Sequence, residues 1–262
     1  MSDLHLRPRT VSELVDAAFQ LYRRHMTLYV VAGAIAMTPV LLVQLFLPDA
    51  TAAGDPADIM TGGFVAQIMS WIASALISAV VMKLGSVSYL GGEPDLAAAL
   101  REVLPRIPLV LLTGVMKLPL YFLGVLCMGF GALYVMARWF ATTTVVVLED
   151  LGPREAFRRS TELSQGRKRH ILNTTLLVFL IYMVLSFAGT AVAALFGGTA
   201  EDFMGSALLV VASTAFTVVA YPVVALTGLV LYYDARIRGE GFDLERMADA
   251  LEPQPLGPQS PA

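Results

Sequence analysis

The sequence predicts an all-α polytopic integral membrane protein, with six transmembrane helices and cytoplasmic amphipathic helices. Of its 262 residues, 56% are hydrophobic and 15% are charged, whereas an ordinary soluble domain has roughly 45–50% apolar and about 25% charged residues. The mean hydropathy of the chain is +0.69. The apolar residues also form blocks of about 20 residues, the length of a helix that crosses a bilayer. These observations exclude a soluble globular fold.

Six apolar blocks are expected to span the membrane. They cover, approximately, residues 27–47, 64–82, 108–126, 130–148, 171–194 and 205–231. The first block is too long and too far from the N-terminus for a secretory signal, so we expect it to be retained. Residues 108–148 have no clear polar break, but one helix of that length would be twice the membrane thickness. A turn near residues 128–131 is therefore expected to divide them.

The membrane domain is expected to cover residues 1–251. Its last element is a short amphipathic helix over residues 242–251. Pro253, Pro255, Pro258 and Pro261 follow it. A proline-rich segment does not form a packed core, so residues 252–262 are predicted to be a disordered tail.

The charges are divided unequally between the two sides of the membrane. If the spans alternate, residues 1–26, 83–107, 149–170 and 232–262 share one side and carry 4, 3, 6 and 3 of the 18 lysines and arginines. The segments on the other side carry acidic residues and no lysine or arginine. This is the positive-inside pattern, which predicts that both termini are cytoplasmic. Tyr89, Tyr232 and Tyr233 near that boundary are expected to be interfacial anchors.

Amphipathic segments recur on the predicted cytoplasmic side. Thr10 and Glu13 have the spacing of a capping box, and apolar residues then recur on one helical face. Similar segments at residues 95–101 and 153–159 precede the third and fifth spans. Their apolar faces either lie at the lipid interface or pack on the bundle. The recurrence indicates either a threefold repeat of one amphipathic helix and two spans, or a generic in-plane helix used three times.

No catalytic or metal-binding pattern stands out in the sequence. The single Cys127 cannot form an intramolecular disulfide or a CxxC site, and none of the three histidines has HExxH spacing. The predicted spans contain neither the Asp nor the Ser–His pair that intramembrane hydrolysis requires. We therefore expect no enzymatic activity, no cofactor and no metal.

Lys117 and Arg138 are the two lysines or arginines that fall inside predicted spans. Each lies nine or ten residues from the cytoplasmic end of its span, about 15 Å deep at the rise of an α-helix. A cation at this depth normally faces the protein interior or a water-filled cavity. The two residues are a candidate intramembrane anion site. The alternative, which helix packing favours, is that they bond to carbonyls freed near Pro119 and to hydroxyls such as Thr142, or extend to one surface.

A second group of cations follows the fourth predicted span. It consists of Arg154, Arg158, Arg159, Arg167, Lys168 and Arg169. Juxtamembrane cations bind anionic lipid at about 1 kcal/mol each, so these residues are candidate lipid head-group contacts. The alternative, simple determination of topology, is favoured because the positive-inside bias alone requires such loops. The group lacks interleaved aromatic residues, so nucleic-acid binding is not expected.

Several strings resemble a known family. They are Arg7-Pro8-Arg9-Thr10, Leu14 to Phe19, Tyr22 to His25, Ala156 to Ser160, Glu162-Leu163, Gly166-Arg167, Leu231 to Asp234, Arg236, Arg238 and Glu240 to Leu244. Together they resemble the bacterial glycerophosphoryl diester phosphodiesterase membrane domain family across nearly the whole chain. In members that give the family its name, this module is fused to a soluble phosphodiesterase barrel. The resemblance therefore implies a bacterial cytoplasmic (inner) membrane protein with the membrane module and without that catalytic domain.

The sequence thus favours a non-catalytic integral membrane module. Its expected partners are the lipid bilayer, with anionic phospholipid in particular, and a lipid-acting or envelope protein or a second copy of the chain. The alternative is a transporter or permease component that moves an anionic solute past Lys117 and Arg138.

Overall fold

The computed structural model describes residues 9–46, 56–126, 130–195 and 203–241. These ranges are helical and contain no strand. The elements are α1 (Val11–Arg24), α2 (Met26–Phe46), α3 (Pro56–Tyr89), α4 (Leu96–Val103), the 3₁₀ turn η1 (Leu104–Arg106), α5 (Ile107–Leu126), α6 (Phe130–Arg138), α7 (Thr142–Leu148), α8 (Pro153–Ser164), α9 (Lys168–Leu195) and α10 (Phe203–Glu240). The predicted tail and the helix over 242–251 lie outside the described residues, as does part of the turn near 128–131.

Six segments of the described chain are long and apolar enough to cross a membrane. They are Met26–Leu45, Gln67–Tyr89, Leu96–Leu126, Gly131–Leu148, Lys168–Val192 and Ala207–Glu240. The predicted all-α membrane fold is confirmed, and each predicted span overlaps one of these segments.

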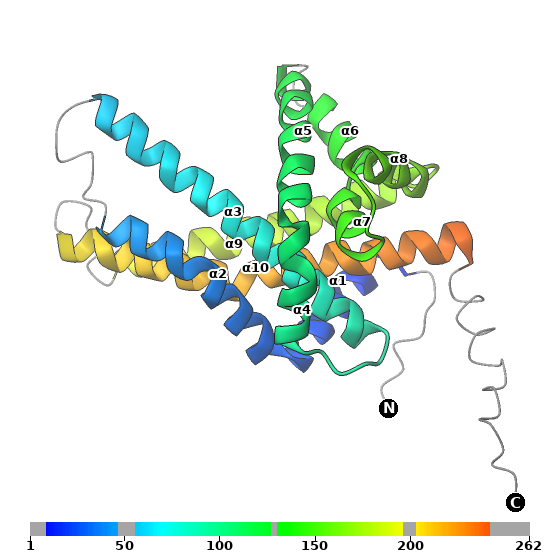
Figure 1. Ribbon diagram of the computed structural model, residues 1–262, viewed down its shortest axis with the longest axis horizontal. Coiled ribbons are helices and arrows are strands. Elements are labelled where there is room, and N and C mark those ends of the chain that lie inside the picture. Colours follow the sequence, from blue (N-terminus) through cyan, green and yellow to red (C-terminus); the bar gives the residue numbers. More distant parts are fainter. Residues whose placement is uncertain (1–8, 47–55, 127–129, 196–202, 242–262) are drawn as a thin grey trace, which may run out of the picture.

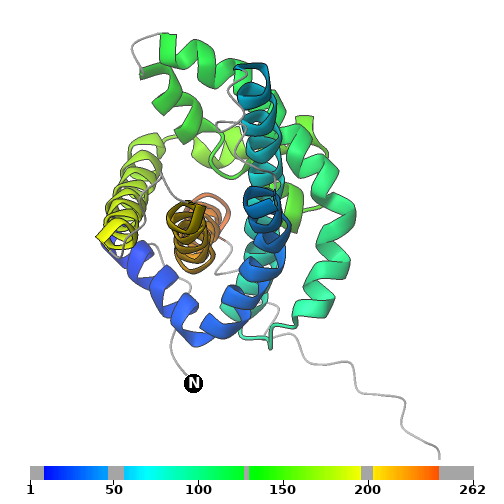
Figure 2. The ribbon, with the colours of Figure 1, turned by 90° about the vertical axis from the view of Figure 1, so that its left-hand side faces the viewer.

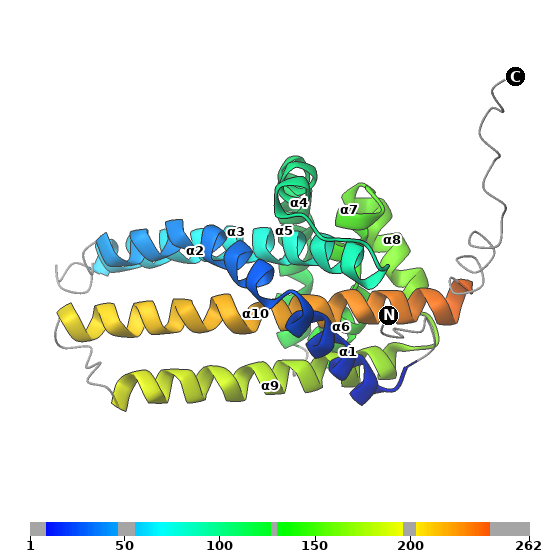
Figure 3. The same ribbon diagram turned by 90° about the horizontal axis from the view of Figure 1, so that it is seen from below.

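Helix α10 is the centre of the bundle. It contacts α1, α2, α3 and α9, and Figure 2 shows these helices around it. Helices α2, α3, α9 and α10 run side by side, and α1 crosses α10 obliquely (Figure 3). The first described residue, Arg9, donates its backbone N–H to Asp234 in α10 at 2.8 Å. The two ends of the described chain therefore lie together at one end of the bundle.

Helices α5 and α6 form a close antiparallel hairpin. Figure 1 shows α5 running across the direction of α2, α9 and α10. A Cβ atom on Gly124 would lie 2.3 Å from the backbone nitrogen of Ala132, and one on Gly131 would lie 2.7 Å from the Cα atom of Gly124. The two backbones touch at this point because neither residue has a side chain.

The fourth predicted span is interrupted rather than continuous. Helix α6 ends at Arg138 and α7 begins at Thr142. The Ser160 hydroxyl of α8 accepts a hydrogen bond from the Ala141 N–H at 3.1 Å and donates to the Arg138 carbonyl at 3.3 Å. It thus satisfies backbone groups that a continuous helix would have paired. Helix α7 is also rich in β-branched residues, which have weak helix propensity.

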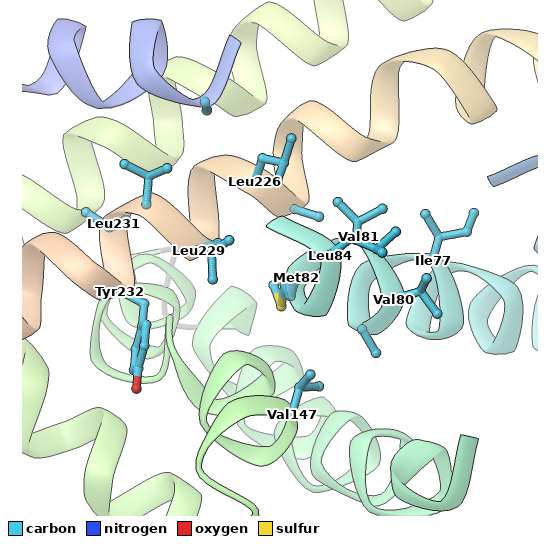
Figure 4. Close-up of a cluster of buried hydrophobic side chains, with 14 of the residues drawn as sticks. Ile77, Val80, Val81, Met82, Leu84, Val147, Leu226, Leu229, Leu231 and Tyr232 are labelled. Atoms are coloured by element: carbon cyan, nitrogen blue, oxygen red, sulfur yellow. The ribbon is translucent and has the colours of Figure 1, made fainter. Parts of the chain in front are cut away.

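Aliphatic side chains of α3, α7 and α10 form the main core. Ile77, Leu84, Val147, Leu226 and Leu229 are at most 1% exposed, and Figure 4 shows them converging from these three helices. A Cβ atom added to Gly85 of α3 would lie 2.5 Å from Leu226 and 2.8 Å from Leu229, both in α10. Close contact between α3 and α10 therefore fixes the centre of the fold.

The three predicted amphipathic helices are present as α1, α4 and α8. Thr10 and Glu13 form the capping box of α1, with Thr10 N donating to Glu13 Oε2 at 2.8 Å. Asp95 caps α4, and Pro153 occupies the first turn of α8. Leu14, Ala18 and Leu21 of α1 are fully buried. The apolar face of α1 therefore packs on the bundle, which is one of the two predicted arrangements.

Candidate functional site

A cavity of about 400 Å³ lies where the α5–α6 hairpin meets α3, α9 and α10. Most of its wall is apolar and aromatic. The aromatic residues that line it are Tyr121, Trp139, Phe140, Phe179, Tyr182 and Tyr221. Its volume falls within the roughly 300–1,000 Å³ of small-molecule sites, which are also mostly apolar with a few placed polar groups.

Lys117 carries the one charged side chain among the residues that line this cavity. Its side chain is partly exposed. Its ammonium group has no hydrogen bond or ion pair with the part of the chain that the structure describes. The Lys117 ammonium therefore does not bond to the carbonyl or hydroxyl groups that were predicted as its partners among the described residues.

Arg138 lies outside the cavity, among hydroxyl groups of α6 and α8. Its Nε atom donates to Thr161 Oγ1 at 3.4 Å, and its Nη1 atom donates to the Tyr134 hydroxyl at 3.0 Å. Lys168 Nζ donates to the same Tyr134 hydroxyl at 3.2 Å. The structure does not bring Lys117 and Arg138 into one cavity. Arg138 follows the hydroxyl-bonded interpretation, although Thr142 is not its partner and donates to a backbone carbonyl at 3.0 Å.

Arg159, predicted as a lipid contact, is an internal clamp. Its Nε atom donates to both carboxylate oxygens of Glu149, at 3.2 and 3.0 Å. Its Nη2 atom donates to Glu240 Oε2 at 3.0 Å. Hydrogen bonding to Glu240 raises the pKa of Arg159 above its usual value, although burial acts in the opposite direction. Arg159 therefore stays charged and joins the C-terminal end of α7 to the end of α10.

Arg167 is also used inside the protein. Its guanidinium donates to the backbone carbonyls of Leu163, Ala235 and Arg238, at 3.5, 3.3 and 2.7 Å. The last of these carbonyls belongs to the final turn of α10, where carbonyl groups lack partners within the helix. Arg167 thus caps α10 and fixes it to the end of α8.

Arg154, Arg158 and Arg169 remain at the surface. Arg154 and Arg169 are exposed. Arg158 is 78% exposed, and its Nε atom lies 3.7 Å from Glu162, which is itself 51% exposed. The predicted group of six cations is therefore divided. Three face outward, two stabilise the fold, and Lys168 shares Tyr134 with Arg138.

A buried polar network that the sequence reasoning did not single out lies at the same end of the bundle. Asp234 is 2% exposed. It accepts hydrogen bonds from Arg9 N and from Arg238 Nε, both at 2.8 Å. Arg238 Nη2 also donates to the Arg9 carbonyl at 2.6 Å, and His170 Nε2 lies 3.4 Å from the Asp234 carboxylate. The available signal was that these arginines and Asp234 belong to strings that carry the family resemblance.

The three tyrosines predicted as interfacial anchors are buried, so that expectation is wrong. Tyr89, Tyr232 and Tyr233 are 6%, 1% and 4% exposed. The rings of Tyr89 and Tyr233 stack at 4.8 Å between centroids. The Tyr232 hydroxyl donates to Glu149 at 2.6 Å, and the Tyr233 hydroxyl lies 2.7 Å from Ser86 Oγ. Each ring has apolar neighbours and each of the two hydroxyls has a partner inside the protein.

The described residues contain no group of three or more His, Cys, Asp or Glu side chains that could hold a metal ion. The chemistry they offer is instead an unpaired ammonium in an aromatic cavity, and exposed guanidinium groups beside apolar helices. Both arrangements bind anions.

Comparison with known proteins gives one match. Residues 106–234, which include α5 to α9 and most of α10, match the family described as the membrane domain of glycerophosphoryl diester phosphodiesterase. No curated protein and no solved structure matches the chain. The matched residues include the α5–α6 hairpin, the cavity residue Lys117, and Asp234 of the buried network. Residues 106–234 of this chain are therefore similar to the membrane-domain family of glycerophosphoryl diester phosphodiesterase.

Proposed function

We propose that this protein is a non-catalytic integral membrane module that associates with anionic phospholipid head groups. The observation that carries the proposal is the exposure of Arg154 and Arg158 on α8 and of Arg169 at the start of α9, a helix apolar enough to span a membrane. Guanidinium groups bind phosphate oxygens in pairs of parallel hydrogen bonds. Three of them at a bilayer surface provide about 1 kcal/mol each toward anionic lipid.

The local structure leaves these arginines available. The opposite face of α8 is buried through Ala156, Ser160 and Leu163, so its arginines at positions 154 and 158 point away from the bundle. The contact of Arg158 with Glu162 is solvent-exposed and long, and pairs of this kind contribute little stability. A phosphodiester group can therefore replace that carboxylate at small cost.

The test compares two triple variants in lipid nanodiscs. Arg154, Arg158 and Arg169 are all replaced by Gln in one and by Lys in the other. Native mass spectrometry counts the phosphatidylglycerol molecules that stay bound, with phosphatidylcholine as the neutral reference. The Gln variant is expected to lose its excess of bound phosphatidylglycerol, whereas the Lys variant keeps most of it because its charge is unchanged. Equal retention in the wild type and the Gln variant would contradict the proposal.

The cavity at Lys117 favours a second candidate, a transporter component for an anionic solute. Such a path was expected to use Lys117 and Arg138 together, and Arg138 does not line the cavity. Flux of an anionic dye from proteoliposomes tests this candidate. A flux that depends on Lys117 would support it, and a flux equal to that of protein-free liposomes would exclude it for that dye.

A further inference from the structure

We propose that the cavity at Lys117 binds one anionic amphiphile from the bilayer, with its head group on the Lys117 ammonium and an apolar chain along the aromatic wall. This internal site is separate from the surface arginines, so the inference goes beyond the proposed function. The cavity volume of about 400 Å³ accommodates a head group and the first part of a chain. The rest of a lipid would extend outward between the helices.

The charge of the cavity defines the ligand's charge. Lys117 has no carboxylate beside it on the cavity wall, and its ammonium has no ion pair with a described residue. An ammonium group in apolar surroundings is poorly solvated unless an anion accompanies it. A single cation matches a ligand with one negative charge, such as a phosphodiester or a carboxylate.

The hydroxyl groups that line the cavity differ in whether they already have partners, and those of Ser78 and Tyr221 share a hydrogen bond. Those of Thr175 and Thr227 donate to backbone carbonyls of their own helices at 2.8 Å, so their protons are already used. Tyr121 and Tyr182 also line the cavity, and neither hydroxyl has a hydrogen bond to a residue that the structure describes. These two phenols can donate to an anion held by Lys117. The donor set is therefore one ammonium and two phenols.

The wall of the cavity indicates a lipid rather than a water-borne ion. Phe179 of α9 lines the cavity and is 54% exposed. The next residue, Leu180, is 59% exposed, and both lie in a segment apolar enough to span the membrane. A ligand that reaches Lys117 past Phe179 crosses an apolar surface, which suits an amphiphile already in the bilayer and opposes a free phosphate ion.

Trp139 provides a direct probe because it lines the cavity. The only other tryptophan in the chain is Trp71, so a Trp71→Phe background leaves one fluorophore. In nanodiscs, phosphatidylglycerol with brominated chains quenches a tryptophan that it contacts. We expect it to quench Trp139 more strongly than brominated phosphatidylcholine does at equal lipid density. Equal quenching by the two lipids would overturn the proposal without any variant of Lys117.

Two lysine variants then assign the preference to one charge. Lys117→Met is expected to raise the phosphatidylglycerol fraction that gives half-maximal quenching about tenfold or more. This is the loss of affinity expected when a charge-assisted hydrogen bond is removed. Lys83→Met is the matched control, because Lys83 lies outside the cavity and pairs with Glu102. Lys117→Arg should retain the preference. A Lys117→Met protein that folds and keeps the full preference for phosphatidylglycerol would overturn the proposal.

Two further measurements distinguish a lipid from a free ion as the ligand, and the internal site from the surface arginines of the proposed function. Inorganic phosphate at millimolar concentration should leave the quenching unchanged, and relief of quenching by phosphate would identify a free-ion site instead of a lipid site. The variant with Gln at Arg154, Arg158 and Arg169 should keep the Trp139 preference while losing surface-bound lipid. If that variant loses both, the internal site is overturned as an independent site.

Discussion

Tyr232 of α10 donates a 2.6 Å hydrogen bond to Glu149 at the C-terminal end of α7. The same carboxylate accepts two hydrogen bonds from Arg159 of α8. The consecutive helices α7 and α8 therefore meet the distant α10 on one carboxylate, close to the core of α3, α7 and α10. The contact therefore links the interrupted fourth span, formed by α6 and α7, to the central helix α10.

Replacing Tyr232 with Phe is expected to lower the free energy of unfolding by about 1.5–3 kcal/mol, the usual contribution of a hydrogen bond to a charged group. Tyr29→Phe is the matched control. Tyr29 is also fully buried, but its hydroxyl has no hydrogen-bond partner among the residues that the structure describes, so removing that hydroxyl should be neutral or stabilising. Thermal or denaturant unfolding in a fixed detergent measures both. Equal losses in the two variants would show that the Glu149 contact contributes nothing specific.

Arg159 and Arg158 are neighbours in the sequence with opposite environments. Arg159 contacts Glu149 and Glu240 with a side chain that is 23% exposed, whereas Arg158 is 78% exposed. Arg159→Gln should lower the unfolding free energy by about 1–3 kcal/mol, because two carboxylates lose a charge-assisted partner. Arg158→Gln should change it by less than about 0.5 kcal/mol. The pair of unfolding curves checks this, and a smaller effect at position 159 than at 158 would be incompatible with the clamp.

Asp234 is expected to hold the N-terminal segment against α10. Asp234→Asn removes a charge that Arg238 and the Arg9 backbone share, and breaking a buried pair costs about 3–5 kcal/mol. Because Arg9 is 7% exposed, trypsin should cleave after Arg9 slowly in the wild type and several times faster in the variant. Cleavage after the exposed Arg154 provides the reference rate within the same sample. An unchanged ratio of the two cleavage rates would mean that Asp234 does not secure this segment.

These contacts show which parts of the structure local sequence could predict. Apolar block length predicts the spans, and Thr10 with Glu13 predicts the start of α1, because both depend on residues close together in the chain. The break before α7 depends on Ser160, which lies 22 residues after Arg138. No pattern within residues 130–148 contains that partner.

The candidate site shows the same limit. Distance along a helix gives the depth of Lys117 and Arg138 but not the direction of each side chain around the bundle. The two cations therefore lie at similar predicted depths, yet Lys117 lines the cavity and Arg138 bonds to Thr161. Tyr232 and Tyr233 are of a residue type that is typical of a membrane–water interface, but their burial depends on α3 and α7 packing against α10.

The hairpin of α5 and α6 gives a final prediction, because its closeness supports the wall of the cavity. Gly124→Ala places a Cβ atom 2.3 Å from Ala132 N, a contact that only a backbone shift can relieve. The expected loss of unfolding free energy is about 1–3 kcal/mol. Gly228→Ala is the control, since its added Cβ atom would lie 3.6 Å from Met82 Cε, an ordinary contact, beside the same cavity.

The hairpin variant should also change the site. If α6 moves away from α5, Met136 and Lys117 no longer line the same cavity, so Trp139 should lose its preference for brominated phosphatidylglycerol. Gly228→Ala should keep that preference with at most a small change in volume. A Gly124→Ala protein with wild-type stability and wild-type quenching would show that the two helices tolerate separation, and that the cavity does not depend on their close approach.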